Sequence, residues 1–137
     1  MAKILTVDDD EDVLFQLRFV LSRLGHEVFP LARADRLIEQ FQKVQPDIVI
    51  SDIVMPGIMG GGVYGMIRQK LGPHVPVIVS SGTRLKIREG ENDPLLAYCP
   101  KPVDFEELEN TIKMLLERKE ALIAGNASED DIDDVHE

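Results

Sequence analysis

The chain has 137 residues, which gives room for one domain with a full hydrophobic core but not for two. Hydrophobic residues make up 44% and charged residues 29% of the sequence, as in ordinary soluble globular proteins, and no apolar run approaches the roughly 20 residues that span a bilayer. The formal net charge of −10 argues against binding to nucleic acid through a basic patch.

The N-terminal part of the sequence predicts a strand followed by a helix. Residues 3–7 are apolar and rich in β-branched side chains, which is typical of a strand. Apolar residues then recur at helical spacing over residues 13–24, and Gly25 follows where a C-terminal cap belongs. Three aspartates separate the two elements. Of these, Asp10 is best interpreted as the N-cap of the helix.

A second strand, a second helix and a third strand follow in order. Residues 26–30 predict a short strand, and residues 34–44 show the apolar spacing of an amphipathic helix that ends before Pro46. The apolar run at residues 48–50 predicts a strand that is buried on both faces, and it leads to a carboxylate, Asp52. The Met-Pro-Gly sequence soon afterwards cannot continue a strand and predicts a loop.

The next part of the chain gives weaker helix signals. Residues 63–71 have helical apolar spacing, but the glycines at 60–62 should fray or delay the helix start, because each glycine costs about 1 kcal/mol relative to alanine. Residues 75–79 predict a fourth strand and residues 95–98 a brief fifth strand. Residues 83–94 between them are polar and support at most a short, loosely held helix.

The last helix has the strongest signals. Asp104 is a candidate N-cap, and Glu107 three residues later completes the pattern of a capping box. The helix is expected to run to about Ala124, with Gly125 as part of the stop signal. The apolar residues 121–124 at its end are either extra core or a partner-docking extension. Five alternations of strand and helix predict a parallel sheet with helices on both faces.

The C-terminal ends of all strands in such a sheet open onto one edge, where α/β sheets bind their ligands. That edge gathers Asp8 and Asp9 after the first strand, Asp52 after the third, Ser81 after the fourth and Lys101 after the fifth. Three neighbouring carboxylates repel one another unless a cation lies among them. Oxygen ligands without His or Cys favour a hard ion, Mg²⁺ first and Mn²⁺ next. A carboxylate, a divalent ion, a lysine and a hydroxyl together predict phosphoryl transfer.

Most of these residues, and Tyr98 at the end of the fifth predicted strand, have a plainer interpretation when they are taken alone. Asp9 could cap the first helix. Asp52 would cap a loop, Ser81 would be a loop hydroxyl, Tyr98 would belong to the core and Lys101 would be a solvated side chain. Their joint order and spacing favour a common site instead.

The single cysteine bears on where the protein works. Cys99 excludes an internal disulfide, and a reducing cytoplasm is the natural setting for such a chain. The N-terminus lacks the layout of a signal peptide. The expected location is therefore the cytoplasm.

The motifs of the sheet edge carry a resemblance to a known family. Over about residues 3–122 the chain resembles a response-regulator receiver domain, the phospho-accepting module of two-component signalling. The motifs are Asp8-Asp9, Asp52 within Ser-Asp-Ile-Val-Met-Pro-Gly, Ser81-Gly82, Tyr98 and Lys101-Pro102. Each motif is common, but the full set in this order is highly specific. The resemblance implies a flavodoxin-like (βα)5 doubly wound sandwich with a five-stranded parallel sheet of order 2-1-3-4-5.

The resemblance also implies how phosphate and metal are bound. Asp52 would be the phosphoacceptor, taking a phosphoryl group from a phosphohistidine. Asp9, Asp52 and the backbone carbonyl of Val54 would bind Mg²⁺ directly, and Asp8 would act mostly through water.

Three further residues would respond to the phosphoryl group. Lys101, in a peptide bond to Pro102 that is expected to be cis, would pair with a phosphoryl oxygen, and Ser81 would donate its hydroxyl to the same group. Tyr98 would be an aromatic switch that moves inward as Ser81 is drawn toward the phosphate.

The resemblance implies a histidine kinase or a histidine phosphotransfer protein as the phosphodonor, and a separate downstream protein as the target. The expected state is a monomer or a phosphorylation-dependent dimer. The expected domains are a receiver over residues 1–124 and an acidic, disordered tail over residues 125–137, which carries six acidic residues and no Lys or Arg. A stand-alone receiver is expected, without enzymatic activity beyond its own phosphorylation and dephosphorylation.

The main alternative is an aspartate-nucleophile phosphohydrolase. Asp8-Asp9-Asp10 resembles the Asp-x-Asp start of haloacid-dehalogenase-type phosphatases, with Asp8 as the nucleophile. The chain is short for that family, lacks an obvious cap domain and would leave the Asp52 loop unexplained. A receiver-like scaffold that binds without phosphorylation is a third hypothesis, and retention of all the acidic residues argues against it.

Overall fold

The structure is a computed structural model that describes residues 1–52, 62–82 and 92–125. In chain order its elements are β1 (Lys3–Val7), α1 (Glu11–Arg23), β2 (Glu27–Leu31), the 3₁₀ helix η1 (Ala34–Arg36), α2 (Leu37–Val44), β3 (Ile48–Ser51), α3 (Gly62–Lys70), β4 (Val77–Val79), β5 (Leu96–Tyr98) and α4 (Phe105–Ala124).

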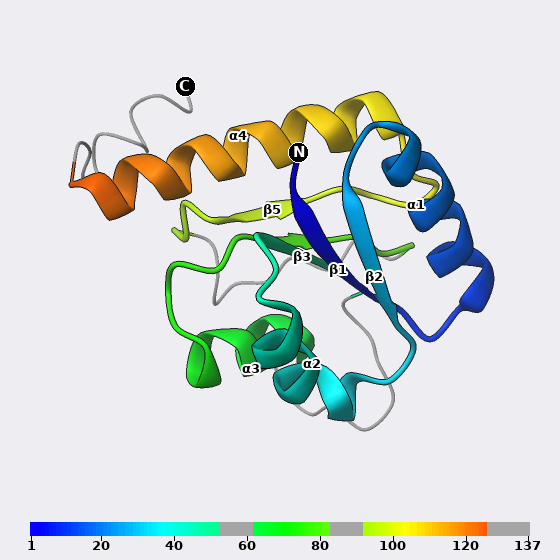
Figure 1. The fold of residues 1–137 in the computed structure, drawn as a ribbon, viewed down its shortest axis with the longest axis horizontal. Helices are drawn as coiled ribbons and strands as arrows, with labels where there is room; N and C mark the ends of the chain where they lie inside the picture. Colours follow the sequence, from blue (N-terminus) through cyan, green and yellow to red (C-terminus); the bar gives the residue numbers. More distant parts are fainter. Residues whose placement is uncertain (53–61, 83–91, 126–137) are drawn as a thin grey trace.

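The strands form one parallel sheet of order β2-β1-β3-β4-β5, which confirms the predicted topology. Helices α1 and α4 lie on one side of this sheet, and α2 and α3 lie on the other (Figure 1). The sheet is therefore covered on both faces, as parallel sheets are.

The core consists of two apolar clusters, one on each face of the sheet. The cluster under α1 and α4 includes Leu17, Ile50 and Ile112, and the cluster under α2 and α3 includes Leu37, Val49 and Ile67. Neighbouring positions of β3 thus point to opposite faces, as strand geometry requires. This explains why β3 reads as an unbroken apolar run.

Capping residues set the ends of α1 and α4 where the sequence predicts them. The Asp10 carboxylate accepts a hydrogen bond from the backbone N–H two residues later, and the Asp104 carboxylate accepts from the N–H groups two and three residues later. Gly25 and Gly125 follow the two helices with φ of 98° and 72°. This left-handed conformation favours glycine and ends each helix.

The edge strand β2 contains a proline that protects the open side of the sheet. Glu27 donates its backbone N–H to the carbonyl of Ala2 on the side of β1. Because successive residues of a strand point their N–H groups to opposite sides, the nitrogen of Pro30 faces the open edge. This position therefore lacks a donor for pairing with another chain.

Several element boundaries differ from those predicted. The region of the second helix begins as η1 before it continues as α2, and its preceding residue, Arg33, makes no side-chain cap. Strand β4 starts at Val77 because Pro76 has no N–H to donate. Leu24 was expected in the apolar stripe of α1 but follows the helix and is half exposed.

The last turn of α4 is partly buried. Ala121 and Leu122 are half-buried, whereas Ile123 and Ala124 are exposed. Upstream, Arg118 donates from a guanidinium nitrogen to the carbonyl of Pro94 at 3.2 Å and ties this half of α4 to the segment before β5.

Some predictions fall outside the described segments. They concern the backbone carbonyl of Val54, most of residues 83–94 and nearly all of the tail over residues 125–137. The division into a receiver over residues 1–124 and an acidic tail stays a prediction. Among the described residues, no helix is long and apolar enough to cross a membrane.

Candidate functional site

Two neighbouring strands place a pair of carboxylates side by side. β1 and β3 pair in parallel with Val7 opposite Ser51, so the residues that follow them, Asp8 and Asp52, meet at the same edge of the sheet. The backbone N–H of Asp52 donates to the carbonyl of Val7 at 3.1 Å and continues the ladder. One carboxylate oxygen from each of Asp8, Asp9 and Asp52 lies within 4.8 Å of the others. The sheet topology thus assembles the acidic cluster that the sequence predicts.

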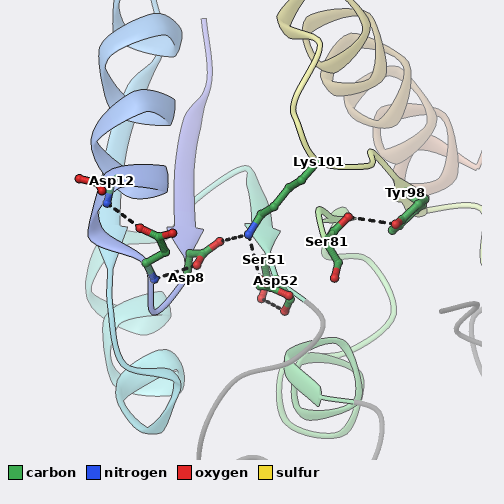
Figure 2. A network of polar contacts seen from close by, with 8 residues as sticks. Asp8, Asp12, Ser51, Asp52, Ser81, Tyr98 and Lys101 are labelled. Carbon is green, nitrogen blue, oxygen red and sulfur yellow. Dashed lines mark hydrogen bonds and ion pairs between the residues drawn. The ribbon is translucent and has the colours of Figure 1, made fainter. Parts of the chain in front are cut away.

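Lys101 reaches this cluster from the segment after β5. Its Nζ donates to Oδ2 of Asp8 at 2.8 Å and to Oδ2 of Asp52 at 2.9 Å, so the ammonium bridges the two carboxylates (Figure 2). Its backbone N–H donates to the carbonyl of Ser81, and its peptide bond to Pro102 is cis, as expected. The lysine is held at both its main chain and its side chain.

The electrostatics of Lys101 favour the charged ammonium. Burial of the side chain alone would lower its pKa, but the hydrogen bonds to Asp8 and Asp52 and the attraction of both negative charges outweigh it and raise the pKa above its usual value. The side chain of Lys101 therefore carries its positive charge where it meets the two carboxylates.

Asp8 is the most constrained member of the cluster. It is only 2% exposed, its Oδ2 accepts from Lys101 and its Oδ1 accepts from the backbone N–H of Asp10 at 2.9 Å. The sequence predicted neither contact, since Asp8 was expected to act mostly through water. Both contacts depend on side-chain orientation, for which strand and helix patterns contain no signal.

Ser81 and Tyr98 form the other side of the site. Ser81 is buried at the end of β4, and its carbonyl accepts from the Tyr98 hydroxyl at 3.1 Å (Figure 2). The side chain of Tyr98 is 40% exposed, so the tyrosine stands outward rather than in the core. The backbone carbonyl of Ser81 thus links this residue to Tyr98, which comes from the next strand.

One further contact steadies the phosphoacceptor candidate. Ser51, the last residue of β3, donates its hydroxyl to the backbone carbonyl of Asp52 at 2.8 Å. The sequence analysis did not single out Ser51. The feature that could have identified Ser51 is its polar side chain at the end of an otherwise apolar strand.

The described residues fit a hard divalent cation. The cluster offers carboxylate oxygens from Asp8, Asp9 and Asp52 close enough to share one ion, and its single bridging ammonium leaves negative charge uncompensated. The structure therefore brings together six of the predicted site residues, namely Asp8, Asp9, Asp52, Ser81, Tyr98 and Lys101. The seventh, Val54, lies outside the described residues.

Comparison with known proteins identifies relatives of this arrangement. A family model described as response regulator receiver domain matches residues 4–113. Protein PilH of Pseudomonas aeruginosa is 31% identical over 123 residues, a match that covers 85% of this chain and 98% of PilH. Three other curated relatives are longer proteins, and the matches cover only 24%, 51% and 31% of their lengths.

Solved structures agree with this similarity. A response regulator receiver domain protein from Clostridium thermocellum superposes with a TM-score of 0.76 at 29% identity, covering 89% of this chain and 99% of that chain. The response regulator protein TrrA from Thermotoga maritima, solved in complex with Mg(2+)-BeF, has a TM-score of 0.71 at 30% identity and covers 84% of this chain and 99% of its own.

Proposed function

Because the chain belongs to the response-regulator receiver-domain family, we propose that it is a phosphorylation-dependent signalling switch with Asp52 as the phosphoacceptor. The observation that carries this proposal is the bridge from Lys101 Nζ to Asp8 and Asp52 beside the three-carboxylate cluster. It combines a nucleophile, a cation for the transferred group and ligands for a metal ion.

The proposed reaction moves a phosphoryl group from nitrogen to oxygen. An Oδ atom of Asp52 attacks the phosphorus of a phosphohistidine, the P–N bond breaks, and the imidazole leaves with the electron pair of that bond. Lys101 then pairs with a phosphoryl oxygen. Mg²⁺, held by Asp9, Asp52 and the carbonyl of Val54 with Asp8 acting through water, would offset charge on the phosphoryl oxygens. Mn²⁺ could fill the same oxygen site.

Asp52 is a better nucleophile candidate than Asp8. Both oxygens of Asp8 accept hydrogen bonds, and the residue is 2% exposed. A carboxylate that is buried and hydrogen-bonded through both oxygens is poorly placed to attack an incoming phosphorus, which counts against the phosphohydrolase hypothesis. Asp8 is better suited to position Lys101.

The proposed output begins at Ser81. Its hydroxyl would donate to the phosphoryl group, which would draw Ser81 toward the phosphate. This movement of Ser81 would disturb its backbone carbonyl, which accepts from the Tyr98 hydroxyl. Tyr98, now outward, would move inward, so phosphorylation would change the population of two packings.

The proposed partners follow from this reaction. A histidine kinase or a histidine phosphotransfer protein would be the phosphodonor, and output would pass through contact with a downstream protein. A cytoplasmic setting is part of the proposal and is supported by the single, buried and unbridged Cys99.

Intact mass after incubation with Mg²⁺ and acetyl phosphate tests the proposal. The expected result is the addition of one phosphoryl group to the natural chain, none to Asp52→Asn, and the natural amount to Asp35→Asn, a matched change at a surface carboxylate paired with Arg33. Chelation of Mg²⁺ should abolish the addition. A phosphoryl group that survives Asp52→Asn would contradict the proposal. Turnover of a phosphate ester that Asp8→Asn abolishes and Asp52→Asn spares would favour the phosphohydrolase.

A further inference from the structure

Helix α1 exposes a pair of aromatic side chains on its outer face. Phe15 is 71% exposed and Phe19 is 52% exposed, and their rings stack with centroids 6.2 Å apart at an interplanar angle of 17°. The guanidinium of Arg23 lies 5.4 Å from the centroid of the Phe19 ring. Scattered exposed apolar residues are ordinary, but two stacked phenylalanines form a contiguous patch that gains free energy when it is covered.

This patch belongs to a row with opposite charges at its ends. Glu11, Phe15, Phe19 and Arg23 follow one another at intervals of four residues, so they line one ridge of the helix. All four are exposed, whereas the core-facing residues of α1 are Leu14, Leu17 and Leu21. The row is acidic at the start of the helix, aromatic in the middle and basic at the end.

The same row is complementary to itself when it is read in reverse. Glu11 and Arg23 lie equally far from the helix position of Leu17, and so do Phe15 and Phe19. Two copies of α1 that pack antiparallel about this position would pair each Glu11 with the partner's Arg23 and each Phe15 with the partner's Phe19.

We propose that α1 is a homodimer interface in which two copies of this chain pack antiparallel about a two-fold axis at the level of Leu17. A two-fold interface requires one patch that is complementary to itself, and the row meets that requirement in both its charges and its aromatic rings. Rows of residues four apart also interdigitate in the commonest class of helix packing.

The symmetry of the row about the position of Leu17 also indicates what covers it. A different protein would not need a row that is symmetric about its own centre, which is why a second copy is the favoured occupant.

The interface is independent of the acidic site. None of the row residues belongs to the cluster of Asp8, Asp9 and Asp52 or bonds to Lys101 in the described contacts. The dimer should therefore form without phosphate or Mg²⁺, and it goes beyond the proposed function. Its failure would leave phosphorylation of Asp52 untouched.

Sedimentation equilibrium of the full, unphosphorylated chain in chelator tests the proposal. One exposed helix row is a small interface, so the expected dissociation constant is on the order of micromolar. Phe19→Ala should weaken it on the order of a hundredfold, since the ring enters the contact twice. Ile123→Ala, which truncates a 63% exposed side chain at the end of α4, should leave it unchanged.

A charge exchange tests the antiparallel pairing itself. Glu11→Arg and Arg23→Glu should each weaken self-association roughly tenfold, because both ion pairs of the dimer become like-charge contacts. When the two variants are mixed, every contact is attractive again, and a mixed dimer of natural affinity should form. Lys113→Glu, an exposed reversal on α4, should not pair with either variant. Circular dichroism of each variant checks that it remains folded.

Three results would overturn the proposal. They are a chain that stays monomeric up to roughly 1 mM, a dimer that Ile123→Ala weakens while Phe19→Ala does not, and folded charge variants that fail to associate on mixing. Binding of a different protein to the row by a monomeric chain would assign the patch to that partner instead.

Discussion

Lys101 sets the charge balance of the site because its ammonium bonds both Asp8 and Asp52. We predict that Lys101→Met lowers phosphorylation by acetyl phosphate on the order of a hundredfold, since a cation beside the transferred group is lost. The same change should tighten Mg²⁺ binding roughly several-fold, because a positive charge that competes for the carboxylates is removed. Calorimetric titration with Mg²⁺ and intact mass measure the two effects.

Lys101→Met is informative because it should lower phosphorylation while it tightens Mg²⁺ binding. A merely disruptive substitution would weaken both metal binding and phosphorylation. Lys101→Arg keeps the charge but changes the donor geometry, so it should leave Mg²⁺ affinity near the natural value while lowering phosphorylation. Weaker Mg²⁺ binding in Lys101→Met would show that the lysine supports the metal ligands rather than competing with them.

How far the sequence determines the site differs between residues. Asp8 and Asp52 could be predicted as neighbours because they follow two strands that topology makes adjacent. The contact of Lys101 with Asp8 could not, because a long side chain chooses among several acceptors according to loop geometry. The outward position of Tyr98 could not be predicted either, because the pattern of apolar and polar residues does not distinguish two rotamers of the same side chain.

At the scale of elements, a polar network joins α3 to the segment before β5. Tyr64 donates its hydroxyl to Asp93 at 2.7 Å, Arg68 donates its Nε to the same carboxylate at 2.7 Å, and a second Arg68 nitrogen donates to the carbonyl of Val75 at 2.8 Å. Apolar spacing predicted this helix but not the network, because Tyr64 and Arg68 have no partner visible in sequence. The network fixes α3 to the far end of the sheet.

The phenol of Tyr64 should make stability sensitive to alkaline pH. Burial, followed by the hydrogen bond and charge of Asp93, raises the pKa of Tyr64 from 10.0 to about 12. The unfolded tyrosine therefore ionises first, and the stability that the phenol contributes is present below pH 10 and lost as the pH rises toward 12. We predict that Tyr64→Phe lowers the free energy of unfolding by about 1 kcal/mol at neutral pH, and that this difference shrinks above pH 10.

Urea unfolding at several pH values measures the difference between Tyr64→Phe and the natural chain. The Phe variant keeps the ring over which Arg68 lies at 5.1 Å, so only the hydroxyl is tested. A difference that stays constant from pH 7 to alkaline pH would mean that the phenol is not the titrating group.

The whole molecule combines a well-covered sheet with a cluster of like charges at its open edge. Alternation of strand and helix patterns was sufficient to predict the sheet, because each element buries a face that only this layering can cover. The Phe15 and Phe19 patch went unnoticed, since analysis of helical spacing follows the core face and treats the outer face as solvated. Function at the surface is therefore less visible in the sequence than the fold is.

The acidic cluster should cost the fold stability in the absence of metal. Asp9 adds a third negative charge beside Asp8 and Asp52, and one lysine does not neutralise all three. We predict that Asp9→Asn raises the free energy of unfolding in chelator by about 0.5 kcal/mol, because removal of the repulsion outweighs the lost attraction between the charge and the start of α1. In Mg²⁺ at ten times its dissociation constant, the natural chain should gain about 1.4 kcal/mol through binding to the folded state, and the variant much less.

The order of the two urea midpoints should therefore reverse between chelator and Mg²⁺, while Asp35→Asn should follow the natural chain in both conditions. A variant that is less stable than the natural chain even in chelator would mean that Asp9 stabilises the fold by itself, and the cluster would then carry no cost for a metal ion to offset.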